Sequence, residues 1–311
     1  MNLSADEVPD ARSRTWTGLA CLGVAALACG LYAPALSAPF LFDDQVYLLE
    51  HNALRSLWPP AYLSGNTRPV LYLSFAANYA IGHFTPWIFR LTNVCIHLAA
   101  GLTLFGLLRR ILQLPRLACL RDAATPLAFS AAALWVAHPV STMAVTYVWQ
   151  RGESLMALCY LFALYAFVRA RTAAYGGARV WAGLTVAASA LGMGVKEPMV
   201  TAPVFVLLLD RALLAGSWRT AFAERWRLYA GLAATWAVLA GLLVMSASSF
   251  HDNPGVGFGA GAASPLRYLA TMPGVHLHYL HLAVVPHPLV FDYLWPLAAG
   301  WRDVLLPGVP W

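Results

Sequence analysis

Long apolar segments constrain most strongly what this chain can fold into. A helix needs about 20 largely apolar residues to cross a bilayer. The sequence predicts spans near residues 16–36, 86–108, 125–139, 153–170, 180–195, 198–215 and 228–248. The third and fifth of these are short for a full crossing. A further apolar stretch at 265–285 is interpreted as an interfacial helix or a partial span.

The low content of charged residues supports this interpretation. Only 11% of the 311 residues are charged, whereas soluble domains carry about 25%. Such a chain cannot cover a soluble surface with polar groups, so we predict an all-α polytopic membrane protein. The net charge of +6 comes from residues spread over short loops without a basic tract, and no nucleic-acid partner is therefore indicated.

The basic loops predict the orientation of the chain. Arginines follow the second, fourth and sixth spans at Arg109, Arg110, Arg116, Arg121, Arg169, Arg171, Arg179, Arg211, Arg219, Arg225 and Arg227. The positive-inside rule places these loops in the cytosol, together with an N-terminal tail over 1–15. The transmembrane domain is then 16–311, with membrane lipids around it. Its long external loop, 37–85, is rich in aromatic residues that suit interfacial helices, and 249–264 is interpreted as a flexible external loop.

Cysteine and histidine patterns do not predict a metal centre. None of the five cysteines forms a Cys-x-x-Cys pair, and the spacing of His276, His278, His281 and His287 is not a strong zinc pattern. The sequence therefore supports neither a disulfide framework nor a divalent metal as cofactor.

An acidic pair and an arginine stand out in the long external loop. Repulsion between Asp43 and Asp44 and partial burial would raise the pKa of one carboxyl group, which suits a general base. The alternative is that the pair only ends the first span at the interface. Arg68, followed by Pro69, has a side chain suited to binding phosphate or to anchoring the loop at the membrane surface.

Further polar residues lie at the predicted external ends of other spans. His138 ends the third span, Arg151 and Glu153 begin the fourth, and Lys196-Glu197 forms a turn that holds the only lysine. Helix capping, an arginine–glutamate pair and an exposed turn are the alternatives. Because all these residues fall on one side, a carboxylate base facing several cations suits transfer of a group from a lipid phosphate.

Four blocks of sequence carry a family resemblance. They read FLFDDQVYLLEHNAL, RPVLYLSFAANYAIGHFTPWIFRLTNVCIHLAAGLTL, ALWVAHPVSTMAVTYVWQRGESLMALCYLFALYAF and KEPMVTAPVFVLLLD. In order and spacing they resemble the membrane domain of the transmembrane and tetratricopeptide-repeat O-mannosyltransferases and their bacterial relatives. The resemblance implies a C-type glycosyltransferase fold. It also implies transfer of a mannose-like hexose from a polyprenyl-phosphate donor to a hydroxyl of a protein or glycan acceptor, at the non-cytosolic face.

The resemblance also implies roles for particular residues. The catalytic aspartate of the family falls on Asp43 or Asp44, with Asp44 narrowly favoured. On charge grounds, contacts to the donor phosphate are assigned to Arg68, Arg151 and Lys196. Supporting roles fall on His138, Glu153 and Glu197.

The chain also departs from the family pattern. Family members continue through further spans and often end in tetratricopeptide repeats, and neither is found here. We therefore expect a C-terminal part to be missing or to be supplied by a partner. A non-catalytic subunit that binds lipid-linked sugar or scaffolds a complex is the main alternative. A transporter ranks third, because the spans are nearly free of charge. The arginine and alanine bias hints at a bacterium, hence at an inner membrane with the site facing the periplasm.

Overall fold

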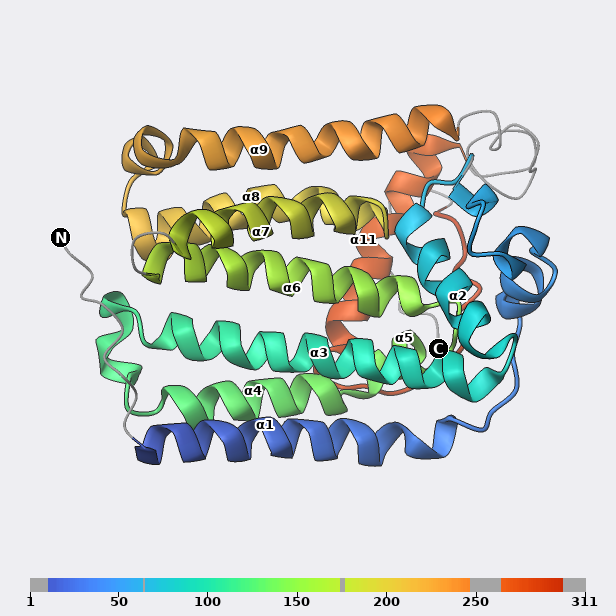
Figure 1. Cartoon of the computed structure of the whole chain (residues 1–311), viewed down its shortest axis with the longest axis horizontal. Helices are drawn as coiled ribbons and strands as arrows, with labels where there is room; N and C mark the ends of the chain where they lie inside the picture. Colours follow the sequence, from blue (N-terminus) through green and yellow to red (C-terminus); the bar gives the residue numbers. More distant parts are fainter. Residues whose placement is uncertain (1–10, 64, 174–176, 247–263, 299–311) are drawn as a thin grey trace.

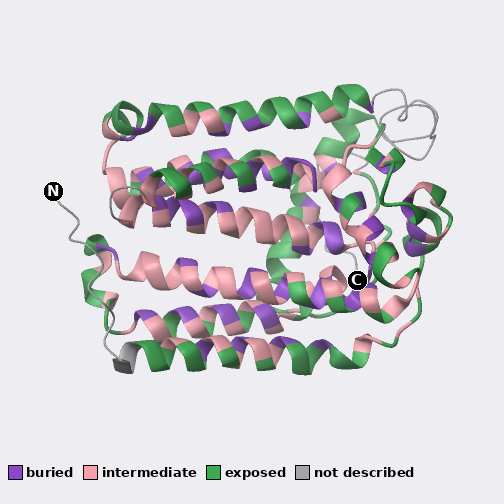
Figure 2. Cartoon of the chain, in the orientation of Figure 1, coloured by how far each residue is buried: buried purple, intermediate pink, exposed green. Residues whose placement is uncertain are grey.

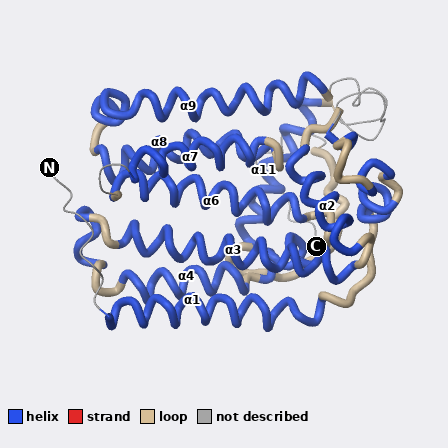
Figure 3. Tube along the Cα trace, in the orientation of Figure 1, coloured by secondary structure: helices blue, strands red, loops and turns tan. Residues whose placement is uncertain are grey.

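A computed structural model of the chain describes residues 11–63, 65–173, 177–246 and 264–298. Most of these residues are helical, with loops between the helices and no strand among them (Figure 3). The long helices are α1 (Ala11–Tyr32), α2 (Pro69–Gly82), α3 (Pro86–Leu112), α4 (Ala124–Ala137), α6 (Arg151–Thr172), α7 (Gly177–Met193), α9 (Trp218–Met245) and α11 (Pro265–Leu282). The predicted all-α polytopic architecture is confirmed. The expected flexible loop at 249–264 lies almost wholly outside the described residues.

Shorter helices connect these elements. They are η1 (Ala33–Ala35), η2 (Gln45–Leu49), η3 (Asn52–Arg55), η4 (Ala61–Leu63), η5 (Pro115–Leu120), η6 (Pro139–Ser141), α5 (Thr142–Thr146), η7 (Glu197–Thr201), α8 (Ala202–Leu209) and η8 (Asp210–Ala215). The last three run on from one another, and Glu197–Ala215 together is long and apolar enough to cross a bilayer.

Each predicted span falls on a helical segment. Within the described residues five segments have the length and apolarity of a membrane span: Arg14–Ala35, Pro86–Leu112, Arg151–Thr172, Glu197–Ala215 and Trp218–Met245. The predicted third span is α4, which is joined to Pro139–Thr146 by a bend of 50°. The bend follows from Pro139, which cannot continue the hydrogen bonding of α4. The predicted fifth span is α7, which is only 17 residues long.

The long helices lie side by side in an up-and-down bundle, and α11 runs across them (Figure 1). In the bundle α3 packs against α1, α4 and α6, while α7 packs against α6 and α9. The path of α11 favours the interfacial interpretation of 265–285 over a partial span. The basic loops after α3, α6 and η8 gather at one end, and α2, α5 and the acidic-pair loop gather at the other.

The outer faces of the bundle are apolar, as a bilayer requires. Exposed positions cover much of α1 and α9 (Figure 2). They include Leu19 and Leu22 on α1, and Val244 and Met245 on α9. Large exposed apolar surfaces mark contact with a membrane or another protein. On helices of this length and apolarity they are the lipid-facing sides.

The long loop predicted over 37–85 has an apolar core of its own. Buried side chains from η2, η3 and η4 pack with α2, the start of α3 and Val148; they are Leu48, Leu54, Tyr62, Leu71, Tyr72, Phe75, Ala76, Phe89 and Val148. Trp149 covers this core and stacks on Tyr47 with ring centroids 4.4 Å apart. Because buried apolar area drives compaction, the loop is a packed cap that holds the acidic pair in a defined place.

Candidate active site

The acidic pair lies in the loop that leaves α1, and its two carboxylates differ in exposure. Asp44 is 0% exposed, whereas Asp43 is exposed. The carboxylate oxygens of Asp44 accept hydrogen bonds from the backbone N–H of Leu41 at 3.1 Å and of Trp149 at 2.8 Å. The backbone N–H of Asp43 donates to the hydroxyl of Tyr147 at 2.8 Å. Asp44 therefore fixes the loop, while Asp43 is the exposed residue of the pair.

The pKa of Asp44 is set by opposing effects. Burial raises the pKa, and it outweighs the two backbone hydrogen bonds and the nearby charge of Arg90, which lower it. Both oxygens of Asp44 already accept a hydrogen bond. Asp43 is the more accessible of the two carboxylates for a substrate proton, and the choice of Asp43 or Asp44 as the base stays a prediction.

Arg90, which the sequence analysis did not single out, holds the segments on either side of the acidic pair. It lies in α3 and is 1% exposed. Its guanidinium donates to the carbonyl oxygens of Ala38 and Pro39, and its Nε donates to that of Thr146 at 3.0 Å. The clamp joins the chain before Asp43 to the end of α5, and so positions the pair on α3.

Arg151 is fully buried at the start of α6, where it joins three helices. Its Nε donates to Asn93 Oδ1 at 2.6 Å, Nη1 to the Ser74 carbonyl and hydroxyl at 3.1 Å each, and Nη2 to the Phe89 carbonyl at 2.9 Å. The guanidinium also lies over the ring of Phe75, 4.5 Å from its centroid. Every guanidinium nitrogen donates to the protein, so these contacts account for the burial of Arg151, and its assignment to the donor phosphate stays a prediction. The side chain lies between α2, α3 and α6.

The spacing of polar residues in α3 indicates the buried residues that the sequence analysis did not identify. Arg90, Asn93 and His97 recur at intervals of three and four residues, which places them on one face of the helix. All three are buried, and a nitrogen of His97 lies 3.1 Å from the carbonyl of Val136. A polar face on an otherwise apolar span faces the protein interior or a cavity, and here it supports the loops of the site.

Four charged side chains form a second group at the same end of the bundle. Arg68, next to the first residue of α2, pairs with Glu197 at 3.2 Å. Lys196 pairs with Glu153 in the first turn of α6. The structure thus brings together two partly exposed cations that were assigned to the donor phosphate and two of the supporting residues. Each cation has a carboxylate as its present partner, and we call these four residues the charge cluster.

The charge cluster is held by close backbone packing. The N–H of Val70 donates to the carbonyl of Gly194 at 3.0 Å, which fixes the turn after α7 on the start of α2. A Cβ on Gly194 would lie 2.8 Å from Cγ2 of Val70, so only glycine fits there without a shift. At Gly152 a Cβ would be in ordinary van der Waals contact with Leu71 and, at 4.0 Å, with Cδ of Lys196, so the lysine stem passes close to the start of α6.

We expect Gly194→Ala to loosen this junction. The added methyl meets a stiff β-branched side chain, and overpacking of this kind costs about 1–3 kcal/mol. Thermal unfolding in detergent measures the change as a lower Tm. Gly183→Ala in α7 is the matched control, because nothing lies within 4 Å of its added Cβ. An equal Tm for both variants would contradict the described packing.

His138 links the end of α4 to the end of α11. Its Nδ1 accepts a hydrogen bond from the N–H of Val140 at 3.3 Å, and its Nε2 lies 3.2 Å from the carbonyl of Ala283. With Nδ1 as acceptor, Nε2 carries the proton and donates to that carbonyl. His138 therefore caps the start of η6, as the helix-capping alternative proposed.

A cavity of about 800 Å³ lies between the bundle and α11. Glu153, His97 and Trp135 line one side, and Tyr279 and Phe291 line the other. Phe291 also stacks on Phe42 with centroids 4.4 Å apart and contacts Tyr147. The cavity therefore shares a wall with the acidic-pair loop and includes one carboxylate of the charge cluster.

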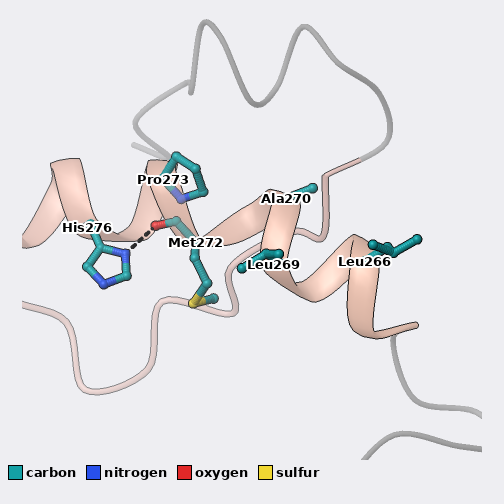
Figure 4. Close-up of a pocket in the computed structure, with 6 residues that line it drawn as sticks. All are labelled: Leu266, Leu269, Ala270, Met272, Pro273 and His276. Atoms are coloured by element: carbon teal, nitrogen blue, oxygen red, sulfur yellow. Dashed lines mark hydrogen bonds between the residues drawn. The ribbon is translucent and has the colours of Figure 1, made fainter. Parts of the chain in front are cut away.

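A second hollow lies on α11 and is apolar (Figure 4). It is lined by Leu266, Leu269, Ala270, Met272, Pro273 and His276, and His276 Nδ1 contacts the carbonyl of Met272 at 2.7 Å. None of these residues belongs to the acidic-pair loop or to the charge cluster. Among the described residues, no three histidine, cysteine or acidic side chains are grouped to hold a metal ion.

Curated relatives resemble about three fifths of the chain. The Drosophila melanogaster proteins Protein O-mannosyl-transferase Tmtc2 and Tmtc1 are each 30% identical, over 61% and 60% of this chain. The human Protein O-mannosyl-transferase TMTC2 is 29% identical over 50% of it. These matches span 21%, 22% and 19% of the respective relatives, so the chain covers about a fifth of their length.

Other comparisons add nothing to these matches. No family model matches the sequence, and no solved structure matches it. The resemblance predicted from the four sequence blocks is nevertheless confirmed by the named relatives. Over about three fifths of its length, the chain is similar to the TMTC protein O-mannosyl-transferases.

Proposed function

We propose that the chain is a glycosyltransferase that moves a mannose-like hexose from a polyprenyl-phosphate donor to a hydroxyl group of a protein or glycan. The site is the end of the bundle that carries the acidic pair and the charge cluster. By the positive-inside rule this end is non-cytosolic, which for a bacterial inner membrane means the periplasm. The names of the relatives support sugar transfer, while the donor and the face of the membrane are inferences from charge.

The observation that carries the proposal is the exposed carboxylate of Asp43 on a rigid loop. In the proposed reaction Asp43 takes the proton from the acceptor hydroxyl, whose oxygen forms the new bond to the anomeric carbon. The bond from that carbon to the phosphate oxygen breaks, and its electron pair leaves with the polyprenyl phosphate. Arg68 and Lys196 stabilise the charge that develops on the leaving phosphate. Asp44, Arg90 and Arg151 hold the loop and do not touch the substrate.

A donor comparison tests this proposal. Purified protein in lipid vesicles would be given a polyprenyl-phosphate hexose or a nucleotide-linked hexose, each radiolabelled, with membrane proteins and glycans as acceptors. We expect label to move from the lipid-linked donor alone. Transfer from the nucleotide sugar alone would overturn the proposed donor. Binding of the lipid-linked donor without transfer would instead favour the non-catalytic subunit.

A further inference from the structure

We infer that Glu153 and Glu197 neutralise, before the donor binds, the two cations that a lipid-linked phosphate binds. Donor binding then exchanges carboxylates for phosphate at Lys196 and Arg68. The inference rests on the proposed function and deepens it, because it names the groups that compete with the donor. It concerns the charge cluster alone and does not depend on which aspartate is the base.

The position of the two cations is the first argument. Arg68 precedes α2 directly, and Lys196 lies against the first turn of α6. Helix N-termini favour anions and disfavour cations, and neither helix has a side chain that caps its free N–H groups. Cations at these ends weaken the helices unless an anion accompanies them. The two glutamates supply that anion through their ion pairs with Arg68 and Lys196.

The exposure of the four side chains is the second argument. The cations Arg68 and Lys196 are 29% and 19% exposed, whereas Glu197 and Glu153 are 40% and 42% exposed. The carboxylates are thus the outer partners. A ligand arriving from outside can replace them without disturbing the core.

The fixed position of the cations is the third argument. The stem of Lys196 passes close to Gly152, and the backbone N–H of Arg68 donates to Asn66 Oδ1 at 2.8 Å. The turn after α7 is bonded to α2 through Gly194. The cations therefore stay in place when a carboxylate moves away, and they form a prepared site for an anion.

The charge balance explains why phosphate replaces the carboxylates. Ion pairs as exposed as these contribute only about 0–1 kcal/mol, so they are readily exchanged. A polyprenyl-phosphate sugar is a phosphodiester with a single negative charge. The monoester that leaves approaches two charges, because its second pKa is about 6. Two cations match that product, so the exchange becomes more favourable as the glycosidic bond breaks.

Binding of polyprenyl phosphate to glutamate variants tests the inference. Wild type, Glu197→Gln and Glu153→Gln would be compared in vesicles by equilibrium binding, with thermal unfolding to show that each variant is folded. We expect each variant to bind about two- to fivefold more tightly, the gain from releasing one weak ion pair. Arg68→Gln is expected to weaken binding, since a charge-assisted contact to the phosphate is lost.

The chain offers a matched control in Glu50→Gln. Glu50 is exposed in the same external loop, and its carboxylate accepts a hydrogen bond from Gln45 at 3.2 Å. Its loss is expected to leave the affinity unchanged, which separates the exchange from a general loss of negative charge. Polyprenol and inorganic phosphate, used as separate probes, show whether the prenyl chain and the phosphate are both needed.

The outcomes separate the inference from the proposed function. Unchanged or weaker binding by both folded glutamine variants, with wild type binding normally, would overturn the exchange and leave the glycosyltransferase proposal standing. Absence of binding by every folded form would overturn the proposed donor, and the exchange with it. A gain seen equally with inorganic phosphate would show that free phosphate, and not a lipid, is the ligand.

Discussion

Asp43→Asn is expected to reduce sugar transfer by about 10²–10⁴-fold, the usual contribution of a positioned general base. Asparagine keeps the size of the side chain but cannot accept the proton of the acceptor hydroxyl. Because Asp43 is exposed and its backbone N–H, which the substitution leaves unchanged, donates to Tyr147, folding should be unaffected. Initial rates from a labelled polyprenyl-phosphate hexose, measured at equal amounts of folded protein, give the result.

Asp44→Asn is the matched control for this prediction. It changes the same functional group one residue away, but it places an amide group where two backbone N–H donors now meet carboxylate oxygens. One donor is left facing the new NH₂ group, which costs about 1–3 kcal/mol when buried. We therefore expect a lower Tm and a partial loss of transfer. Full activity in Asp43→Asn with complete loss in a folded Asp44→Asn would reverse the assignment of the base.

Arg151→Ala is expected to be the most damaging substitution for stability. It removes the donor for Asn93 Oδ1, for the Ser74 carbonyl and for the Phe89 carbonyl, all at a buried junction of α2, α3 and α6. Asn93 Oδ1 is left without its donor, whereas the two carbonyls keep their helical hydrogen bonds and lose a second, charged donor. Hydrogen bonds to a charged group contribute about 1.5–3 kcal/mol each, so the total loss is expected to be about 3 kcal/mol or more. Thermal unfolding and the yield of monodisperse protein in detergent measure this loss.

Arg151→Lys distinguishes a structural role from a contact to the donor. Lysine keeps the charge but not the planar set of donors, so we expect an intermediate Tm. Polyprenyl-phosphate affinity per folded molecule should stay close to that of wild type. A variant with the wild-type Tm and greatly weakened phosphate binding would restore Arg151 to the donor site.

The sequence predicted the helices well, because apolarity over about 20 residues is a local property. The predicted ends of the helices differ from the structure where a helix continues beyond its apolar part or bends at a proline. The last span was placed at 228–248, but α9 begins at Trp218, because its basic first turns are helical without being apolar. The third span was expected to end at Pro139, and the structure shows a bend there followed by α5.

The site could be predicted only in part. The alternation of basic and acidic loops along the chain predicted that Asp43, Arg68 and Lys196 lie at one end of the bundle. The prediction succeeds because the order of the spans determines which loops share a side. The burial of Arg151 could not be predicted, since it depends on α2 folding back over α3 and α6. The same limit applies to the exposure of Asp43 and burial of Asp44: adjacent residues in a loop have no periodicity that assigns them to different surroundings.

One measurement tests the central claim most directly. Purified protein in vesicles would receive a polyprenyl-phosphate hexose labelled in both the sugar and the prenyl chain, together with an acceptor membrane fraction. The proposed function predicts that hexose bound to the acceptor and free polyprenyl phosphate appear in equal amounts and at the same rate. Free polyprenyl phosphate without sugar on the acceptor would show hydrolysis, and a donor that stays bound and intact would show a binding subunit. Either result would contradict the account.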